Sequence, residues 1–287
     1  MPIKSIGFIG LGMMGGSLAF LVKKYFPDAM IYAADADQKT IDFALSQGII
    51  QSGSTEWTNF PKNLDLIWIC TPISTIEDIA FEASEYFDKA TIITDIGSVK
   101  QPILNIFRNT HSGFIAGHPM AGIEKTGIEY ASVSIVEKAP YILITQISEK
   151  YAVFSKFIAQ LGFDVIEMEA EAHDEAMAYA SHLPYLMACL TASASAHLSE
   201  DKKEQEDKEE QLQRVLGPGF RDTTRVAASS VHWGTDVCRF NKKAILEALS
   251  EVEKQIKDLK EKIITGNPID IQKKLQGFKD ARTRLIP

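Results

Sequence analysis

Two side chains suited to moving a proton follow predicted strands in the middle of the chain. Ser98 stands in segment 95–100, between a predicted strand and a predicted helix, and His118 comes just after the next strand, before Pro119. A neutral imidazole accepts a proton or a hydrogen bond near neutral pH, as the oxidation of a hydroxyl group requires. We therefore predict that His118 is catalytic and that Ser98 lies beside it, with an N-cap as the simpler interpretation of Ser98.

The later part of the chain carries a second group of polar motifs. His182 stands in segment 181–184, which reads Ser-His-Leu-Pro, and segment 217–225 places two arginines and one aspartate within five residues after a glycine-rich break. Guanidinium groups bind carboxylates through paired hydrogen bonds, so these arginines suit a dicarboxylate substrate. Asp222 and Arg225 are three residues apart and could equally form an ion pair on a helix surface.

The remaining histidines and the cysteines follow no motif. We expect most of these histidines to be structural or exposed: His111, His173, His197 and His232. The cysteines are widely spaced and form no CxxC pair: Cys70, Cys189 and Cys238. These patterns indicate neither a disulfide framework nor a metal site, and they suit the reducing cytoplasm.

A glycine-rich turn lies near the start of the chain. Gly10, Gly12 and Gly15 follow a predicted strand and open a helix, and Asp35 ends the next strand. Such glycines let backbone N–H groups approach a pyrophosphate, and the carboxylate can bind a ribose diol. Asp35 would repel a 2′-phosphate, and no Arg or Lys occurs in segment 33–38. The turn therefore predicts a dinucleotide site that prefers NAD to NADP, with a purely structural turn as the alternative.

Thr71 and Pro72 follow directly after a third predicted strand. Ligands of open α/β sheets bind at the carboxyl ends of the strands, so both residues could line the cofactor. Proline after a strand is also common in loops, and that interpretation stays open.

The elements that position these residues alternate in type through the first half of the chain. Amphipathic helices are predicted at 37–47 and 73–86. Strands are predicted at 5–10, 30–34, 64–70, 91–95, 113–117, 141–145 and 164–168. Repeated strand–helix–strand order predicts an α/β fold with a doubly wound parallel sheet of the Rossmann type.

After residue 168 the strand patterns stop and the sequence predicts helices only. We therefore predict an NAD-binding domain over 1–168 and an all-α domain over 169–287 for substrate and dimerisation. A heptad-like apolar stripe runs through Ile245, Leu249, Val252, Ile256, Leu259 and Ile263. Such a stripe needs a partner helix, from a second subunit or from its own domain, and the subunit interface is slightly favoured. The charged segment 201–210 is assigned no function.

The composition excludes several classes of protein. The chain has 287 residues, of which 45% are hydrophobic and 24% charged, and its formal net charge is -8. This balance is that of a globular protein and argues against a nucleic-acid partner, which needs clustered Lys and Arg. The apolar stretch 7–22 holds five glycines and is too short to span a bilayer, so no membrane segment is expected.

Taken together, the motifs resemble those of the prephenate/arogenate dehydrogenases of tyrosine biosynthesis. The resemblance rests on five segments that follow in order over nearly the whole chain: 10–15, 94–100, 117–125, 181–184 and 219–225. It implies an oxidative decarboxylation in which prephenate and NAD give 4-hydroxyphenylpyruvate, CO2 and NADH, or in which arogenate gives tyrosine. It also implies a homodimer formed through the helical domain.

The resemblance further implies roles for single residues. His118 would accept a hydrogen bond from the ring hydroxyl of the substrate, and Ser98 would orient that hydroxyl and the cofactor. Arg225 would bind the substrate carboxylate, with Asp222 and Glu124 in a gating or electrostatic network around it. His182 would line the pocket from the helical domain.

Some features depart from the family pattern or leave choices open. Pro218 and Ile123 replace residues common in the family, which affects the detail of the pocket. We expect neither a fused chorismate mutase nor a C-terminal ACT domain, so tyrosine feedback would act at the active site.

Prephenate is favoured over arogenate as the substrate, and a dual cyclohexadienyl dehydrogenase stays open. The more remote alternatives are a β-hydroxyacid dehydrogenase and an NAD-sensing protein without turnover.

Overall fold

The computed structural model describes residues 3–107, 110–111, 113–197 and 202–286. The chain separates into two compact units, one that ends at Asn241 and one that begins at Lys242. The predicted division at residue 168 rests on a different criterion, the change from strands to helices, and stays a prediction. All predicted site residues belong to the first unit.

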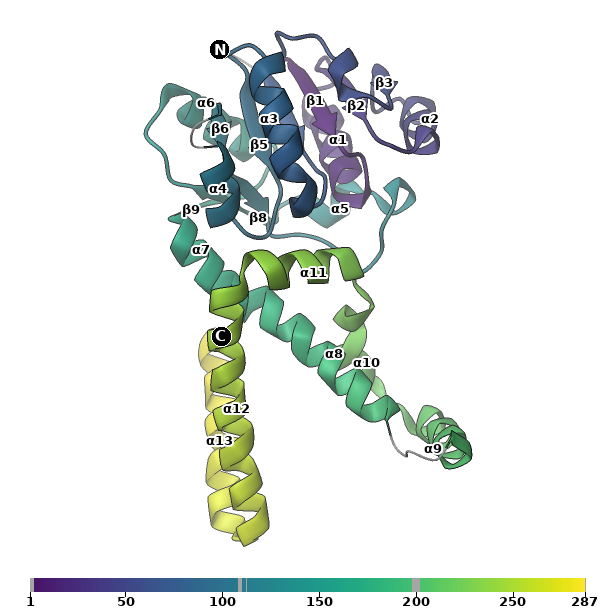
Figure 1. Ribbon diagram of the computed structural model, residues 1–287, viewed down its shortest axis with the longest axis vertical. Helices are drawn as coiled ribbons and strands as arrows, with labels where there is room; N and C mark the ends of the chain where they lie inside the picture. The colour runs from purple at the N-terminus through teal and green to yellow at the C-terminus, as the bar shows by residue number, and fades with distance from the viewer. Residues whose placement is uncertain (1–2, 108–109, 112, 198–201, 287) are drawn as a thin grey trace. The chain divides into compact units, whose positions relative to one another are not determined.

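The first unit contains a six-stranded sheet (Figure 1) in the order β3-β2-β1-β4-β5-β6. Its strands are β1 Ser5–Ile9, β2 Met30–Ala34, β3 Ser52–Ser54, β4 Leu66–Ile69, β5 Ile92–Asp95 and β6 Phe114–Ile115. Every pair is parallel. The predicted doubly wound α/β fold is confirmed, although the short edge strand β3 was not predicted because its residues Ser-Gly-Ser have little strand propensity.

The chain then leaves this sheet, which corrects the prediction of a single strand over 113–117. Gly117 begins a new strand, β7 Gly117–Pro119, which pairs antiparallel with β8 Pro140–Ile144. Strand β9 Asp164–Met168 pairs parallel with β8 and completes a three-stranded sheet. A Cβ atom at Gly117 would lie only 2.7 Å from the Tyr141 ring, so glycine allows the two strands to approach.

Helices cover both faces of the large sheet, because the right-handed crossovers on either side of β1 fall on opposite faces. Phe8 and Trp68 stack at 5.6 Å on the face that packs against α1 (Met13–Tyr25) and α6 (Glu149–Gln160). Helix α3 (Ile76–Tyr86) lies in front of the strands in Figure 1. The predicted strand–helix alternation thus becomes a packed, layered unit.

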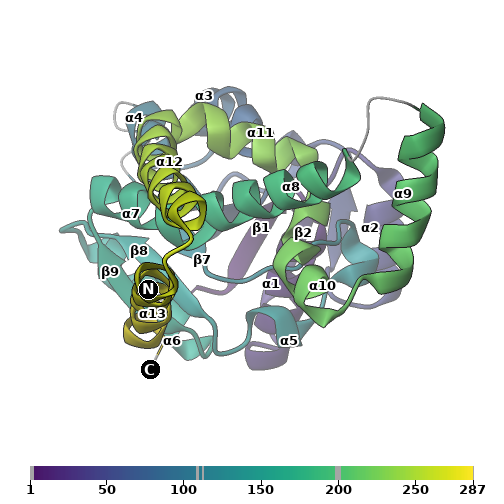
Figure 2. The ribbon, with the colours of Figure 1, turned by 90° about the horizontal axis from the view of Figure 1, so that it is seen from below.

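The rest of the first unit is mainly helical. Its further α-helices are α2 Gln38–Ser46, α4 Gln101–Phe107, α5 Val133–Val136, α7 Ala170–Met177, α8 Leu183–Ala196, α9 Lys202–Val215, α10 Pro218–Thr224 and α11 Val231–Phe240. Short 3-10 turns occupy Trp57–Asn59, Ile73–Thr75, Ile128–Tyr130 and Arg225–Ala228. A π turn, Ala178–His182, joins α7 to α8. Figure 2 shows α7 and α8 as successive parts of one helical run.

The second unit is a hairpin of α12 (Lys242–Thr265) and α13 (Pro268–Leu285). Gly266 adopts φ +65 between the helices, and the side chain of Asn267 caps α13 by accepting a hydrogen bond from the N–H of Ile269. Lys274 joins the two helices through an ion pair of 2.6 Å with Asp258. None of the described helices is both long enough and apolar enough to cross a bilayer.

Candidate active site

The glycine-rich turn has the geometry that its sequence predicts. Gly10 adopts φ +89, and its N–H donates to the carbonyl of Ala34 at the end of β2. A Cβ atom at Gly15 would overlap the carbonyl oxygen of Gly10, so only glycine fits where helix α1 meets strand β1. The turn therefore places the start of α1 against the carboxyl end of the sheet.

The amino-terminal end of α1 has room for an anion. Gly12 is its N-cap residue and offers no side-chain hydrogen bond, and the first turn carries no acidic residue. A Cβ atom at Gly12 would meet nothing within 4 Å. Unsatisfied N–H groups at a helix start bind phosphate groups well, so these residues fit the pyrophosphate of a dinucleotide.

Asp35 lies directly beside this turn. Its carboxylate accepts hydrogen bonds from the N–H of Leu11 at 2.8 Å and from the N–H of Asp37 at 3.0 Å. The two bonds fix the orientation of the carboxylate, and its remaining lone pairs can bind a ribose diol. Thr71 also lies here, since its methyl group is 3.0 Å from a Cβ position at Gly10.

His118 sits in β7 with only 8% of its surface exposed. Its Nδ1 lies 2.9 Å from Nε2 of His173, and Nδ1 of His173 lies 2.8 Å from the carboxylate of Asp174. A carboxylate can only accept, so Nδ1 of His173 carries the proton and its Nε2 is the acceptor. Nδ1 of His118 must then donate, which leaves Nε2 of His118 as an unprotonated acceptor.

Asp174 is itself held firmly. It accepts hydrogen bonds from the backbone N–H groups of Lys100 and Gln101 at 2.7 and 2.9 Å, at the start of α4. The carboxylate therefore caps this helix, and Ser98, whose simpler interpretation was a helix cap, has its hydroxyl free for another role. The chain from α4 through Asp174 and His173 fixes the imidazole of His118.

The histidines of this region are neutral. Burial lowers the pKa of His118 well below its usual value, and the nearby charge of Lys100 acts in the same direction. Burial also lowers the pKa of His173, against the hydrogen bond to Asp174, and it lowers the pKa of His182 to about 4. Neutral His118 can accept a hydrogen bond throughout the physiological pH range.

A buried ion pair supports the strand that carries His118. The ammonium group of Lys100 lies 2.5 Å from the carboxylate of Asp95 and donates to the carbonyl of Gly117 at 2.6 Å. Both charged side chains are fully excluded from solvent. Burial lowers the pKa of Lys100, while the charge of Asp95 raises it. The pair ties the end of β5 to the first residue of β7.

Ser98 and His182 lie at the same place, together with residues of α11. The indole N–H of Trp233 donates to Oγ of Ser98 at 3.1 Å, and the Trp233 ring packs edge-on against His182 at 6.0 Å. Nδ1 of His182 faces the side-chain amide of Asn241 at 3.2 Å. Figure 1 shows α11 across the lower edge of the sheet, where the strands end. The structure thus brings Ser98 and His182 together through Trp233.

The predicted carboxylate-binding residues are only partly assembled. Arg225 forms an ion pair with Glu124 at 2.9 Å, and the two side chains are 59% and 29% exposed. Among the described residues, Asp222 forms no ion pair, and its side chain is exposed. The structure therefore joins Arg225 to Glu124 and supports neither a helix-surface pair between Asp222 and Arg225 nor a network that includes Asp222.

Several side chains of the site were not found from the sequence. His173 was expected to be structural or exposed, yet it is the direct partner of His118. Asp174, Lys100, Trp233 and Asn241 were not singled out at all. The neighbouring pair His173-Asp174 was the one available signal, because adjacent imidazole and carboxylate groups recur in acid–base sites.

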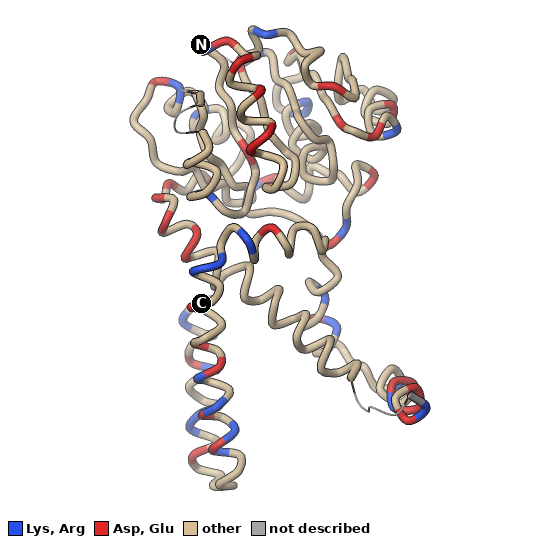
Figure 3. The backbone as a smooth tube through the Cα atoms, viewed as in Figure 1, with Lys and Arg blue, Asp and Glu red and all other residues tan. Residues whose placement is uncertain are grey.

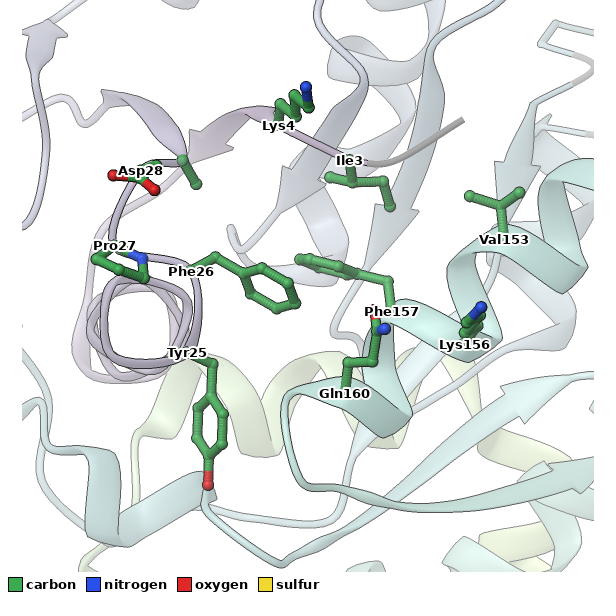
Figure 4. A pocket seen from close by; sticks show the side chains of 11 residues that line it. Ile3, Lys4, Tyr25, Phe26, Pro27, Asp28, Val153, Lys156, Phe157 and Gln160 are labelled. Atoms are coloured by element: carbon green, nitrogen blue, oxygen red, sulfur yellow. The ribbon is translucent and has the colours of Figure 1, made fainter.

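A cavity of about 940 Å³ lies away from these residues. Figure 4 shows Phe26 and Phe157 facing each other inside it, with Lys4 and Lys156 nearby. Lys4 precedes β1, so this cavity lies at the opposite edge of the sheet from the glycine-rich turn. Within the described residues, no group of three or more His, Cys, Asp and Glu side chains is placed to hold a metal ion.

An open anion site at a helix start, an oriented acidic residue and a buried neutral histidine define a dinucleotide-dependent dehydrogenase. Family models identify the group to which it belongs. The nucleotide-binding domain of prephenate dehydrogenase matches residues 18–162, and the dimerization domain of prephenate dehydrogenase matches residues 169–279.

Individual proteins agree with the family models. The prephenate dehydrogenase of Lactococcus lactis is 32% identical over 268 residues, which cover 91% of this chain and 72% of that protein. The structure of Aquifex aeolicus prephenate dehydrogenase with hydroxyphenyl propionate and NAD+ matches with a TM-score of 0.89 at 28% identity and covers 99% of both chains. Synechocystis arogenate dehydrogenase matches with a TM-score of 0.80 at 26% identity, over 98% of this chain and 100% of that one.

The chain therefore belongs to the prephenate dehydrogenase family. The prediction of an NAD-dependent dehydrogenase of this family is confirmed.

Proposed function

We propose that this protein oxidises and decarboxylates prephenate to 4-hydroxyphenylpyruvate and CO2 in tyrosine biosynthesis, with NAD as the oxidant. One observation carries the proposal: the buried chain Asp174–His173–His118 leaves Nε2 of His118 as a neutral acceptor of hydrogen bonds. A ring hydroxyl that is being oxidised needs such an acceptor. Among the described residues, none forms a hydrogen bond with this nitrogen, so it is available to the substrate.

The cofactor would be held by the predicted residues at the carboxyl edge of the sheet. Gly10, Gly12 and Gly15 bring backbone N–H groups to the pyrophosphate, and Asp35 accepts hydrogen bonds from the ribose. Thr71 and Pro72 line the same edge at the end of β4. NAD, when bound, accepts the hydride that leaves the substrate.

The protein's own groups align the substrate and stabilise charge. His118 accepts the hydrogen bond of the ring hydroxyl and stabilises the positive charge that develops at this oxygen as the adjacent C–H bond breaks. Cleavage of the bond to the ring carboxylate releases CO2, and its electron pair completes the aromatic ring. Since aromatisation drives the reaction, orientation and electrostatics are the main tasks of the site.

Arg225 is proposed to bind the carboxylate end of the substrate, with Glu124 as its electrostatic partner. Their ion pair is partly exposed, so a substrate carboxylate can reach the guanidinium group without first displacing a buried partner. His182 lines the same pocket from the helical part of the chain. Asp222, which is exposed, would act on the substrate only through the field of its charge.

The helical part is proposed to form a homodimer. Helix α8 carries no charged residue along its length (Figure 3), yet its Leu190 is 56% exposed. On α12, Ile256 and Ile263 of the apolar stripe are 47% and 58% exposed. Exposed apolar helices need a covering partner, and a second copy would supply it. Sedimentation of the purified protein tests this, and a monomer at micromolar concentration would refute it.

We further propose that the protein acts in the cytoplasm and has no nucleic-acid partner. All three cysteines are free, as a reducing compartment requires. The formal net charge of -8 opposes binding to a polyanion.

Arogenate is the second candidate substrate, since Synechocystis arogenate dehydrogenase covers nearly the whole chain. Arogenate carries an ammonium group in place of the keto group of prephenate. Glu124 offers a carboxylate to such a group, next to the carboxylate site at Arg225. The specificity therefore depends on how Glu124 is shared between Arg225 and the ligand.

One assay tests both candidates. The purified protein is offered prephenate and arogenate separately, each with NAD and with NADP, and reduced cofactor is followed by its absorbance. We expect turnover of prephenate with NAD. Faster turnover of arogenate would transfer the assignment to arogenate, equal rates would indicate a cyclohexadienyl dehydrogenase, and no turnover of either would refute the proposal.

A further inference from the structure

The hydroxyl group of Ser98 has one partner among the described residues. It accepts a hydrogen bond from the indole N–H of Trp233 at 3.1 Å. Ser98 is only 6% exposed, and Asp174 caps the following helix in its place. Among the described residues, none accepts the hydroxyl proton of Ser98.

An indole N–H can only donate, which decides the polarity of this contact. One lone pair of Ser98 Oγ is occupied by Trp233. The hydroxyl proton of Ser98 therefore points away from the indole N–H and can be donated to a bound ligand. Trp233 thus occupies one acceptor position of Ser98 and leaves its hydroxyl proton to be donated to a bound ligand.

Neighbouring side chains fix the indole. His182 packs edge-on against the Trp233 ring at 6.0 Å and Tyr185 does so at 5.1 Å. A Cβ atom at Gly234 would overlap the Tyr185 hydroxyl, so the ring of Tyr185 fills the space beside α11. The side-chain amide of Asn241 donates to the carbonyl of Asp174 and faces Nδ1 of His182. These contacts hold the imidazole ring of His182 in place.

Helix α11 is also anchored to the cofactor edge. The buried carboxylate of Asp236 accepts hydrogen bonds from the backbone N–H and the hydroxyl of Ser74, both at 3.1 Å. Ser74 lies in the turn that follows Thr71 and Pro72. The helix that carries Trp233 is thereby tied to a loop other than that of Ser98, and its position does not depend on Ser98 alone.

We propose that Trp233 is a positioning residue that sets the hydrogen-bond polarity of the active site through Ser98. This proposal rests on the proposed function. The site then has one fixed acceptor, Nε2 of His118, and one fixed donor, the hydroxyl of Ser98. A substrate hydroxyl is aligned when it donates its proton to Nε2 of His118. The ligand atom that accepts from Ser98 is either the oxygen of that hydroxyl or the carboxamide oxygen of nicotinamide.

A double-mutant cycle tests the inference. Trp233→Phe keeps an aromatic ring against His182 and removes the N–H, and Ser98→Ala removes the hydroxyl. We expect Trp233→Phe to lower kcat about 10-fold in the wild-type background and to have no further effect in the Ser98→Ala background. Equal effects in both backgrounds, or full activity of Trp233→Phe, would overturn the proposal. Trp57→Phe, away from the site, is the matched control and should keep full activity.

Two further measurements complete the test. The first measurement is the affinity for NAD in the absence of substrate. If the hydroxyl of Ser98 donates to the nicotinamide carboxamide, this affinity falls in Ser98→Ala. If it donates to the substrate hydroxyl, the affinity stays unchanged. The indole N–H resonance of Trp233, identified by its loss in Trp233→Phe among the three tryptophans, should shift in Ser98→Ala. An unshifted resonance would overturn the proposal about Trp233, whether or not the wild-type protein shows turnover. A wild-type protein that turned over neither substrate would refute the proposed function and would leave the resonance test in place.

Discussion

The dinucleotide edge and the histidine network are built in different ways. The edge is made mostly of backbone, because Gly10, Gly12 and Gly15 lie in one short turn and work through the absence of side chains. The network is made of side chains from distant segments, such as His118 in β7 and His173 in α7. The edge should therefore be sensitive to added volume, and the network should be sensitive to the identity of donors and acceptors.

The largest effect is expected at His118. Asn in place of His118 cannot supply the acceptor that imidazole Nε2 places in the site, so kcat should fall by about 10² to 10⁴, while the affinity for NAD changes little. Steady-state kinetics with NAD titrations measure both. Unchanged turnover would remove His118 from the mechanism, and an equal loss of NAD affinity would show that the network and the edge are not separate.

The edge should respond to a single methyl group. Gly15→Ala places a Cβ atom against the carbonyl of Gly10, so the turn must shift and NAD affinity should fall about 10- to 100-fold. Gly277→Ala is the matched control, since it is also a helical glycine but its Cβ would meet nothing within 4 Å. The control should keep NAD affinity and gain up to about 1 kcal/mol of stability. Normal NAD binding by Gly15→Ala would contradict the close approach of α1 and β1.

The same contrast explains what the sequence could predict. The glycine turn and Asp35 were predictable because their spacing follows from local strand–helix–strand geometry. The partner of His118 was not, because His173 is brought near only when α7 packs beside β7, and no spacing along the chain encodes that contact. The second sheet was missed for a similar reason, since the break at Gly117 depends on the tertiary contact with Tyr141.

The exposed ion pair between Arg225 and Glu124 should affect catalysis less than the dinucleotide edge or the histidine network does. Arg225→Ala should raise the KM for the substrate about 10-fold with little change in kcat, because a carboxylate site binds ground and transition states alike. Glu124→Gln keeps the shape of the partner side chain and removes its charge, and it should change KM less than Arg225→Ala does. An unchanged KM for Arg225→Ala would exclude it from carboxylate binding and leave the substrate anchored by the buried network.

The last effect concerns stability rather than catalysis: the buried network should make the free energy of unfolding depend on pH. The pKa of His182 is lowered by burial to about 4, whereas an unfolded chain has a histidine pKa of about 6.5. Between these values the unfolded state binds a proton that the native state does not, so the free energy of unfolding decreases as the pH falls through this window. The contribution of His182 is about 1.4 kcal/mol per pH unit, complete above pH 6.5 and lost towards pH 4. Urea unfolding across this range should show a shallower slope for His182→Gln, and equal slopes would mean that His182 is already protonated in the native protein.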